Sequence, residues 1–267
     1  MTVIYETGYS LPSGDQPLTH ARIAHSLNWL SGGTVTASST ATGYFAGGPT
    51  NSLTYERWKP AGATATWEYD HGSAVECDYC AIAAHTMGTN GNSLTVQYYD
   101  GAAWQDLTAS TAITTDGPLM AILEPVTAQR WRISLASGTA PEIGVVKFGS
   151  ALQMQQPLYG GHAPISTARQ TILRSNYSET GEFLGRSKQR TYLATQYAWQ
   201  HPTEAWVRAN WPTFQLATES EPFFIAWRPD RLDDVAFAQL DEVPIPSNMG
   251  IRAYMEVSMQ VRARGYN

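Results

Sequence analysis

Apolar and polar residues alternate along several short stretches of the chain. In 65–70 (ATWEYD), Trp67 and Tyr69 share one face, and the polar side chains lie on the other. The stretches 93–100 (SLTVQYYD) and 129–135 (QRWRISL) repeat this pattern. Because successive side chains of a strand point to opposite faces, a period of two predicts strands that are buried on one side.

Turn signals separate these predicted strands. The pairs Asn90-Gly91, Asp100-Gly101 and Asp116-Gly117 are typical of tight turns between strands. Short strands divided by such turns at intervals of about ten residues favour a β-sandwich. We therefore expect an all-β protein.

The second half of the chain is also patterned for strands. The stretch 251–264 (IRAYMEVSMQVRAR) alternates throughout and predicts one long closing strand. The stretch 221–237 (EPFFIAWRPDRLDDVAF) predicts a strand, a Pro-Asp turn, and then either a second strand or a short helix.

Four segments follow from these patterns and from the distribution of Pro and Gly. We expect an irregular N-terminal arm at 1–19, a first β domain at 20–152, a linker at 153–166 and a second β domain at 167–267. The linker is rich in Pro, Gly and Gln, which is typical of loops and connections.

The charge of the chain excludes some partners. Its 17 Lys and Arg against 23 Asp and Glu give a net charge of −6, and no basic block offers the cationic surface that nucleic acid requires. No apolar run approaches the ~20 residues of a membrane-spanning helix. The first residues do not form a signal peptide, so we expect synthesis in the cytoplasm, no membrane insertion and no nucleic-acid partner.

Cys77 and Cys80 are the only cysteines, in a C-x-x-C spacing. In an extended strand, residues three apart point to opposite faces, so we expect two buried, reduced thiols rather than a disulfide or a redox pair. Two cysteines also supply only half of the ligands of a structural zinc site. A site shared between subunits stays open as an alternative.

The sequence predicts no cofactor, no metal site and no enzymatic activity. It has no phosphate-binding glycine loop and no nucleophile elbow. The carboxylate pairs Glu219/Glu221 and Asp233/Asp234 are interpreted as solvated surface acids. His85 follows an apolar run, and we expect a buried ring hydrogen-bonded to the backbone.

Aromatic residues near predicted loops are the candidate binding residues. Tyr44, Tyr55, Trp58 and Trp104 could stack on sugar rings or form a protein interface, since aromatic side chains serve both roles. Phe45 and Trp67 belong to the same group of rings. The core or interface interpretation is favoured over sugar contact.

The first half resembles a discoidin or galactose-binding-like jelly roll of the kind found in phage tail proteins. The resemblance rests on THARI (19–23), TYERWKPAG (54–62), CAIAAHTMGTNGNSLTVQYYDGAAW (80–104), QRWRI (130–134) and EIGVVKFGSAL (142–152). It implies a jelly-roll sandwich over about half the chain. The paired cysteines and the loop spikes of many sugar- or lipid-binding members are missing, so sugar affinity does not carry over.

The second half is similar to tail-tip or minor tail proteins of tailed bacteriophages. The similar segments are TGEFLGRS (180–187), EAWVRANWPTF (204–214) and EPFFIAWRPDRLDDVAF (221–237). The resemblance implies a second β-sandwich-like domain, akin to distal tail proteins, that packs in a ring. The expected function is a structural virion protein of the tail tip or baseplate, with copies of itself and the tail tube, hub and fibres as partners. The alternative is a carbohydrate-binding module that adheres to bacterial surface glycan.

Overall fold

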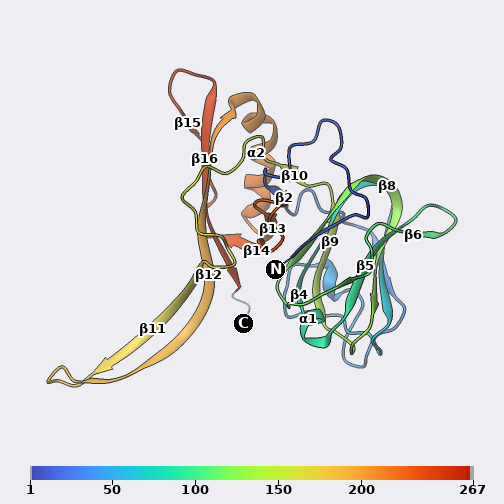
Figure 1. Ribbon diagram of the computed structural model, residues 1–267, viewed down its shortest axis with the longest axis horizontal. Helices are drawn as coiled ribbons and strands as arrows, with labels where there is room; N and C mark the ends of the chain where they lie inside the picture. The colour runs from blue at the N-terminus through green and yellow to red at the C-terminus, as the bar shows by residue number, and fades with distance from the viewer. Residues whose placement is uncertain (1, 265–267) are drawn as a thin grey trace.

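The computed structural model describes residues 2–264, which form two sheets of eight strands each (Figure 1). The expected all-β fold is confirmed. The first sheet contains β1 (Thr2–Tyr5), β3 (Thr34–Ala37), β4 (Ala65–His85), β5 (Ser93–Tyr99), β6 (Trp104–Asp106), β7 (Thr111–Ala112), β8 (Leu119–Ala136) and β9 (Ile143–Gly149). Two short helices, η1 (Gly48–Thr50) and α1 (Met87–Asn90), lie in its connections.

The long strands β4 and β8 build a jelly-roll sandwich because each contributes to two layers. The first part of β4 pairs with β3 and with the last part of β8, which also pairs with β5. The remainder of β4 pairs with β9, and the start of β8 pairs in parallel with β1. Register shifts after Asp70 and after Cys77 lie where β4 passes from one layer to the other. Residues 2–5, expected in an irregular arm, form β1 instead.

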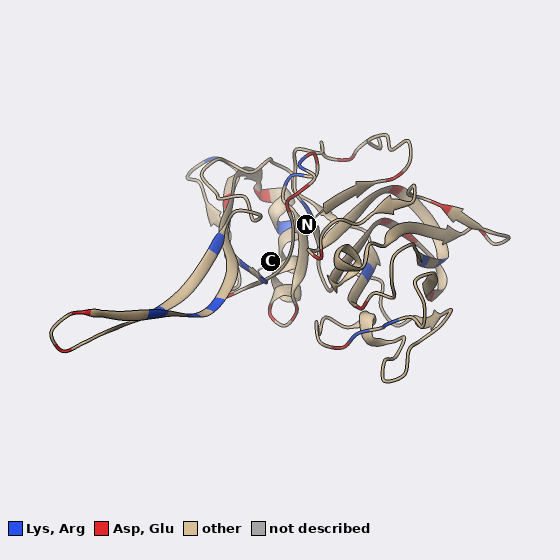
Figure 2. Ribbon diagram, turned by 60° about the horizontal axis from the view of Figure 1, so that its bottom comes forward, with Lys and Arg blue, Asp and Glu red and all other residues tan. Residues whose placement is uncertain are grey.

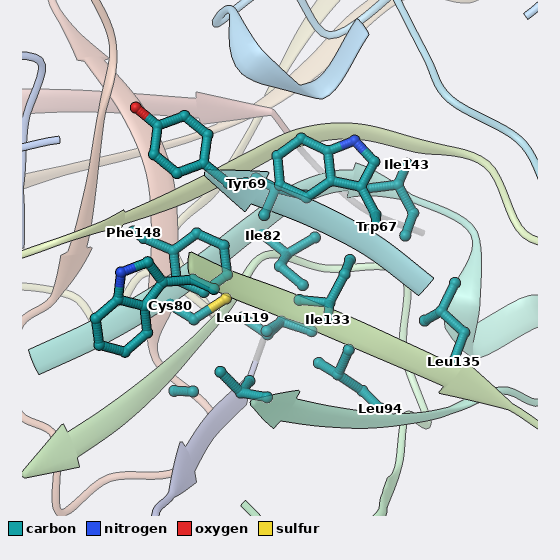
Figure 3. Close-up of a cluster of buried hydrophobic side chains, with 14 of the residues drawn as sticks. Trp67, Tyr69, Cys80, Ile82, Leu94, Leu119, Ile133, Leu135, Ile143 and Phe148 are labelled. Atoms are coloured by element: carbon teal, nitrogen blue, oxygen red, sulfur yellow. The ribbon is translucent and has the colours of Figure 1, made fainter. Parts of the chain in front are cut away.

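The core of the sandwich lies between these two layers. Trp67, Trp131 and Ile133 from the first layer meet Ile82 and Phe148 from the second. Figure 3 shows the side chains of Trp67, Ile82, Ile133 and Phe148 in the space between the strands. The alternation in 65–70, 93–99 and 130–135 therefore identified real strands, each with its apolar face in this core.

The second sheet is assembled from segments that are distant in the sequence. Its strands are β2 (Arg22–Ala24), β10 (Leu152–Gln153), β11 (Arg169–Tyr177), β12 (Phe183–Thr203), β13 (Phe223–Ala226), β14 (Val235–Leu240), β15 (Ser247–Asn248) and β16 (Tyr254–Arg264). Its main order is β10-β2-β13-β14-β16-β12-β11. Of the two possibilities for 221–237, the structure has a strand, a turn and a second strand. The closing strand begins at Tyr254, so the expectation that it starts at Ile251, which is fully exposed, is wrong.

One helix, α2 (Glu204–Thr218), covers a face of the second sheet. Thr203 caps it by accepting a hydrogen bond from the backbone N of Trp206 at 3.3 Å. Val207, Trp211 and Phe214 point into the core at helical spacing. Pro212 lies inside the helix and obscures this pattern in the sequence.

The two sheets are joined by a shared apolar interface. The outer face of the second jelly-roll layer, with Tyr79, Ala81 and Met120, packs against Phe224 and Phe237 of the second sheet. β2 and β10, which lie at the two ends of the predicted 20–152 domain, pair within the second sheet. The segment division predicted above stays a prediction, and the second sheet draws strands from both sides of the predicted linker.

Candidate binding and assembly surfaces

Tyr44 and Tyr55 line one hollow on the loops of the jelly roll. Its volume is about 410 Å³, and Phe45, Arg57 and Glu142 complete much of its wall. Phe45 is 51% exposed and Tyr55 is 74% exposed, so both rings are free to contact a ligand. The hollow therefore combines aromatic faces with a charged group, a combination that is common in small-molecule sites.

Glu142 is the polar centre of this hollow. Its carboxylate accepts a hydrogen bond from the Tyr44 hydroxyl at 2.7 Å and pairs with Arg57 at 2.8 Å. Lys59 lies 3.7 Å away from the same carboxylate. The bond from Tyr44, followed by the bond and charge of Arg57, lowers the pKa of Glu142. The carboxylate is thus held ionised and fixed, as an acceptor for hydroxyl groups rather than as a proton donor.

Trp58 and Trp104, the other two candidate aromatics, do not join this hollow. Trp58 is completely buried, and its ring N donates to the carbonyl of Ser39 at 3.0 Å. Its backbone also bridges to Ile143. Trp58 is therefore a core residue, and its inclusion among surface contacts is corrected.

Trp104 lies on β6, in a separate stack with cations. The Cζ atoms of Arg132 and Arg130 lie 4.1 and 5.2 Å from its ring centroid, and Tyr99 lies 5.4 Å away. Arg130 also pairs with Glu68 at 2.6 Å. Because Arg130 and Arg132 already contact its ring, Trp104 stabilises the surface of the sheet.

The two thiols lie in the same core cluster, contrary to the expectation of opposite faces. The register shift between Cys77 and Tyr79 moves the alternation by one residue, so Cys77 and Cys80 both join the jelly-roll core, while Tyr79 joins the interface with the second sheet. Both thiols are free and fully buried. Burial raises the pKa of each thiol well above its usual value, which makes them unreactive.

The contacts of His85 and Asp234 show whether each side chain is buried or solvated. His85 is buried, and its Nε2 lies 2.9 Å from the carbonyl of Gly117, as expected. Asp234 was interpreted as solvated, but it is buried and accepts a hydrogen bond from the Ser166 hydroxyl at 2.6 Å. Within residues 2–264, no group of three or more His, Cys, Asp or Glu is placed to hold a metal ion. The helices of this part of the chain are also too short or too polar to cross a bilayer.

The most exposed element is a long ribbon that leaves the body of the molecule (Figure 1). We call residues 169–191, from β11 and the outer half of β12, the hairpin arm. Nearly every residue of it is exposed. Its large exposed apolar side chains are Ile172, Leu173, Tyr177, Phe183 and Leu184.

Both edges of the hairpin arm lack a neighbouring strand among the described residues. β11 pairs only with β12, and β12 pairs with β16 only from Tyr192 onward. A two-stranded ribbon is marginally stable by itself in water, and unpaired edges readily add another strand. The sequence pattern does not predict this arm, because its mixed apolar and basic residues show no clean alternation.

Known proteins resemble this chain in fold only. No family model matches it, and no curated protein matches it. A pectin-binding carbohydrate-binding module is 18% identical over 45% of this chain and 91% of its own, with a TM-score of 0.40. Chitosan-binding module 1 of a chitosanase/glucanase from Paenibacillus sp. IK-5 is 19% identical over 48% and 99%, with a TM-score of 0.38.

A third similar structure is the family 32 carbohydrate-binding module of C. perfringens NanJ in complex with galactose. It is 13% identical over 45% of this chain and 97% of its own, with a TM-score of 0.40. At such identities and TM-scores the likeness does not establish a ligand for this chain. These structures also lend no support to the resemblance of the second half to phage tail proteins.

Proposed function

We propose that this chain is a non-catalytic structural subunit that assembles with copies of itself through the hairpin arm, as part of the tail tip or baseplate of a bacteriophage. The observation that carries the assembly is the arm itself, a ribbon with apolar side chains and two open edges. Exposed apolar area of this kind is typical of a surface that is covered by a partner. The tail location rests on the resemblance of residues 180–187, 204–214 and 221–237.

A ring is the form of assembly that best suits this arm. When the arm contacts the body of a second copy rather than that copy's arm, the contact joins two different surfaces. Head-to-tail contacts of this type close into rings when the rotation between subunits permits, and otherwise extend into filaments. In the virion, the neighbours above and below such a ring would be the tail tube, the hub and the fibres, and synthesis would take place in the host cytoplasm.

Removal of the hairpin arm tests the assembly. Replacing residues 173–189 with Asn-Gly joins Ile172 to Arg190, which are paired in the native register, through a two-residue turn. Sedimentation velocity of the intact chain is expected to show a ring or larger assembly, and the shortened chain is expected to be monomeric with an unchanged melting temperature. Leu216→Thr, which removes an exposed apolar side chain on α2, is the control and should leave assembly intact.

A second experiment addresses the tail location. Virions purified from a phage that encodes this chain should contain it in fixed stoichiometry, detected by mass spectrometry and by immunogold labelling at the tail tip. A chain that is absent from particles and monomeric in the lysate contradicts the proposal.

Glycan binding by the jelly roll is the second candidate function, and the hollow around Glu142 is the observation that favours it. Sugar hydroxyls would bond to the Glu142 carboxylate, and the Phe45 and Tyr55 rings would stack on a sugar face. A weak site would gain strength from repetition in a ring, because linked sites bind with avidity.

A glycan array followed by calorimetry on the intact chain tests this candidate. Tyr55→Ala is expected to weaken binding at least about tenfold, while Trp104→Phe, outside the hollow, leaves it unchanged. The absence of any binding at millimolar sugar would exclude this role.

A further inference from the structure

A cleft with an excess of arginine lies at the base of the hairpin arm. Its volume is about 610 Å³, and it runs between the loop 52–55 of the jelly roll and the second sheet. Arg190, Arg262 and Arg264 line it, and among the described residues of its wall Glu221 is the one with an acidic side chain. In a chain with a net charge of −6, this local excess of cations indicates a site for an anionic partner.

The arginines share one face of the second sheet. Arg190 and Tyr192 are two apart on β12, so their side chains lie on the same face of the sheet. Tyr192 is opposite Arg264 in the register with β16, so the side chain of Arg264 lies on this face as well. The Cζ atoms of Arg190 and Arg262 each lie 5.3 Å from the Tyr192 ring centroid. Both guanidinium groups therefore contact one ring, and both arginines line the cleft.

The existing ion pairs leave room for further carboxylates. Arg262 bonds through its Nε to Asp241 at 2.9 Å, and the two side chains are 41% and 37% exposed. Arg190 is exposed and contacts the Tyr192 ring. Guanidinium groups bind carboxylates through paired hydrogen bonds, so the chemistry of the cleft suits a short segment with two acids beside an apolar or aromatic side chain.

The tip of the hairpin arm has this chemistry. Residues 177–183 (YSETGEF) contain Glu179 and Glu182 and no cation. Tyr177 and Phe183 flank the acids, with ring centroids 5.7 Å apart and more than half of each side chain exposed. Figure 2 shows the contrast along the arm, with Lys and Arg on its strands and Asp and Glu at its tip.

The tip is held in a fixed shape before any partner arrives. The backbone N of Ser178 donates to the carbonyl of Glu182 at 2.9 Å, and the backbone N of Gly181 donates to the carbonyl of Ser178 at 3.0 Å. The Ser178 hydroxyl accepts a further bond from the backbone N of Glu182 at 3.0 Å. A preformed tip loses little conformational entropy on docking.

The tip of a molecule is remote from its own cleft. Arg190 lies eight positions after Glu182 along β12, a distance of about 26 Å at the usual rise per residue of an extended strand. An arm that extends outward therefore presents its acids to another molecule. Contact between two different surfaces of identical chains is the head-to-tail arrangement that forms rings.

We propose that the tip 177–183 of one copy docks into the arginine cleft of the next copy, with Glu179 and Glu182 paired to Arg190 and Arg262. Tyr177 and Phe183 then cover the Tyr55 side of the cleft, where the jelly-roll loop supplies an exposed ring. This docking presupposes the arm-driven assembly proposed above and names the surface that receives the arm. It also gives the loop 52–55 a role in the interface.

Charge reversal of each surface tests the docking. The tip variant is Glu179→Arg with Glu182→Arg, and the cleft variant is Arg190→Glu with Arg262→Glu. In sedimentation velocity on the full chain at 50 mM salt, each variant alone is expected to raise the dissociation constant for self-association at least about tenfold. Glu219→Arg, an exposed reversal outside both surfaces, is the control and should have no effect.

Mixing the two variants provides the decisive result. The reversed tip fits the reversed cleft, and the native tip of the cleft variant fits the native cleft of the tip variant. An equimolar mixture is therefore expected to recover assembly, with the two chains alternating. Circular dichroism melts of each variant establish that loss of assembly is not loss of fold.

Three outcomes separate this docking from the proposed function. Assembly that survives both reversals but not removal of the arm overturns the docking and leaves arm-driven assembly standing. Assembly that survives removal of the arm overturns both. If the cleft variant assembles normally but loses binding to polygalacturonate that the native chain shows, the cleft is a site for acidic glycan and the docking is overturned.

Discussion

β4 and the hairpin arm are both long antiparallel elements, yet their surroundings are opposite. The last seven residues of β4 are buried on both faces, between the jelly-roll core and the second sheet. The arm is exposed on both faces and at both edges. The last part of β4 has neighbours on both faces within the described chain, and the arm has none on its outer edges.

The contrast locates the two kinds of function in different parts of the molecule. The jelly roll is complete, so any activity of its own has to come from a surface feature such as the Glu142 hollow. The arm has unpaired edges and exposed apolar side chains, and in the assembly that we propose a second copy covers it. Substitutions in the two regions should therefore separate stability from assembly.

Trp131→Ala is expected to have the largest effect on stability. Trp131 is fully buried, and its ring lies 6.1 Å from the ring of Phe148 across the core. Removing a buried ring of this size costs about 3–5 kcal/mol, since a cavity remains. Urea denaturation should show this loss, and a change below about 1 kcal/mol would mean that the sandwich core contributes little to folding.

Asp78 gives β4 a pH-dependent contribution to stability. It lies on β4, and its carboxylate accepts a hydrogen bond from the backbone N of Ala151 at 2.8 Å. Burial raises its pKa from 3.8 to about 7, against the opposing effects of this bond and of Arg22. The folded state then holds a proton that the unfolded state releases between pH 4 and 7, so stability falls as the pH rises through this range.

Asp78→Asn removes this dependence and keeps the acceptor oxygen. At pH 8 the variant is expected to be more stable than the native chain by up to about 4 kcal/mol, and at pH 4 the two should be nearly equal. Chemical denaturation at pH 4, 6 and 8 measures the difference. Glu182→Gln on the arm is the control. If the free energy of unfolding changes equally with pH in the native chain and in Asp78→Asn, Asp78 is not the source of the pH dependence.

The sequence predicted the strands that have one buried face and missed the features that depend on distant partners. Trp67 and Trp131 alternate with polar residues because only one side of each strand meets the core. The register shift beside Cys77 has no signature in the sequence, so the faces of the two thiols were assigned wrongly. The Glu142 hollow was missed because its bond to Arg57 joins residues that are 85 positions apart.

Thr203→Ala tests the inner end of β12, the strand whose outer end forms part of the hairpin arm. Thr203 ends β12 and caps α2, which packs on the second sheet. Losing a helix cap costs about 1 kcal/mol. Thermal denaturation should show this change, while sedimentation at a temperature well below melting should show unchanged assembly.

Leu184→Thr, at the outer end of the same strand, is expected to have the smallest effect on stability. Leu184 is 66% exposed, so an isolated molecule loses almost no buried area, and the change should stay within about 0.5 kcal/mol. In the assembly the same side chain lies on a surface that a second copy covers, so self-association should weaken. We expect Thr203→Ala to lower stability and leave assembly normal, and Leu184→Thr to leave stability normal and weaken assembly. This pair of results would show that one strand serves both folding and association. Equal effects of the two substitutions on both measurements would mean that the hairpin arm folds against its own molecule, and the contrast with β4 would no longer hold.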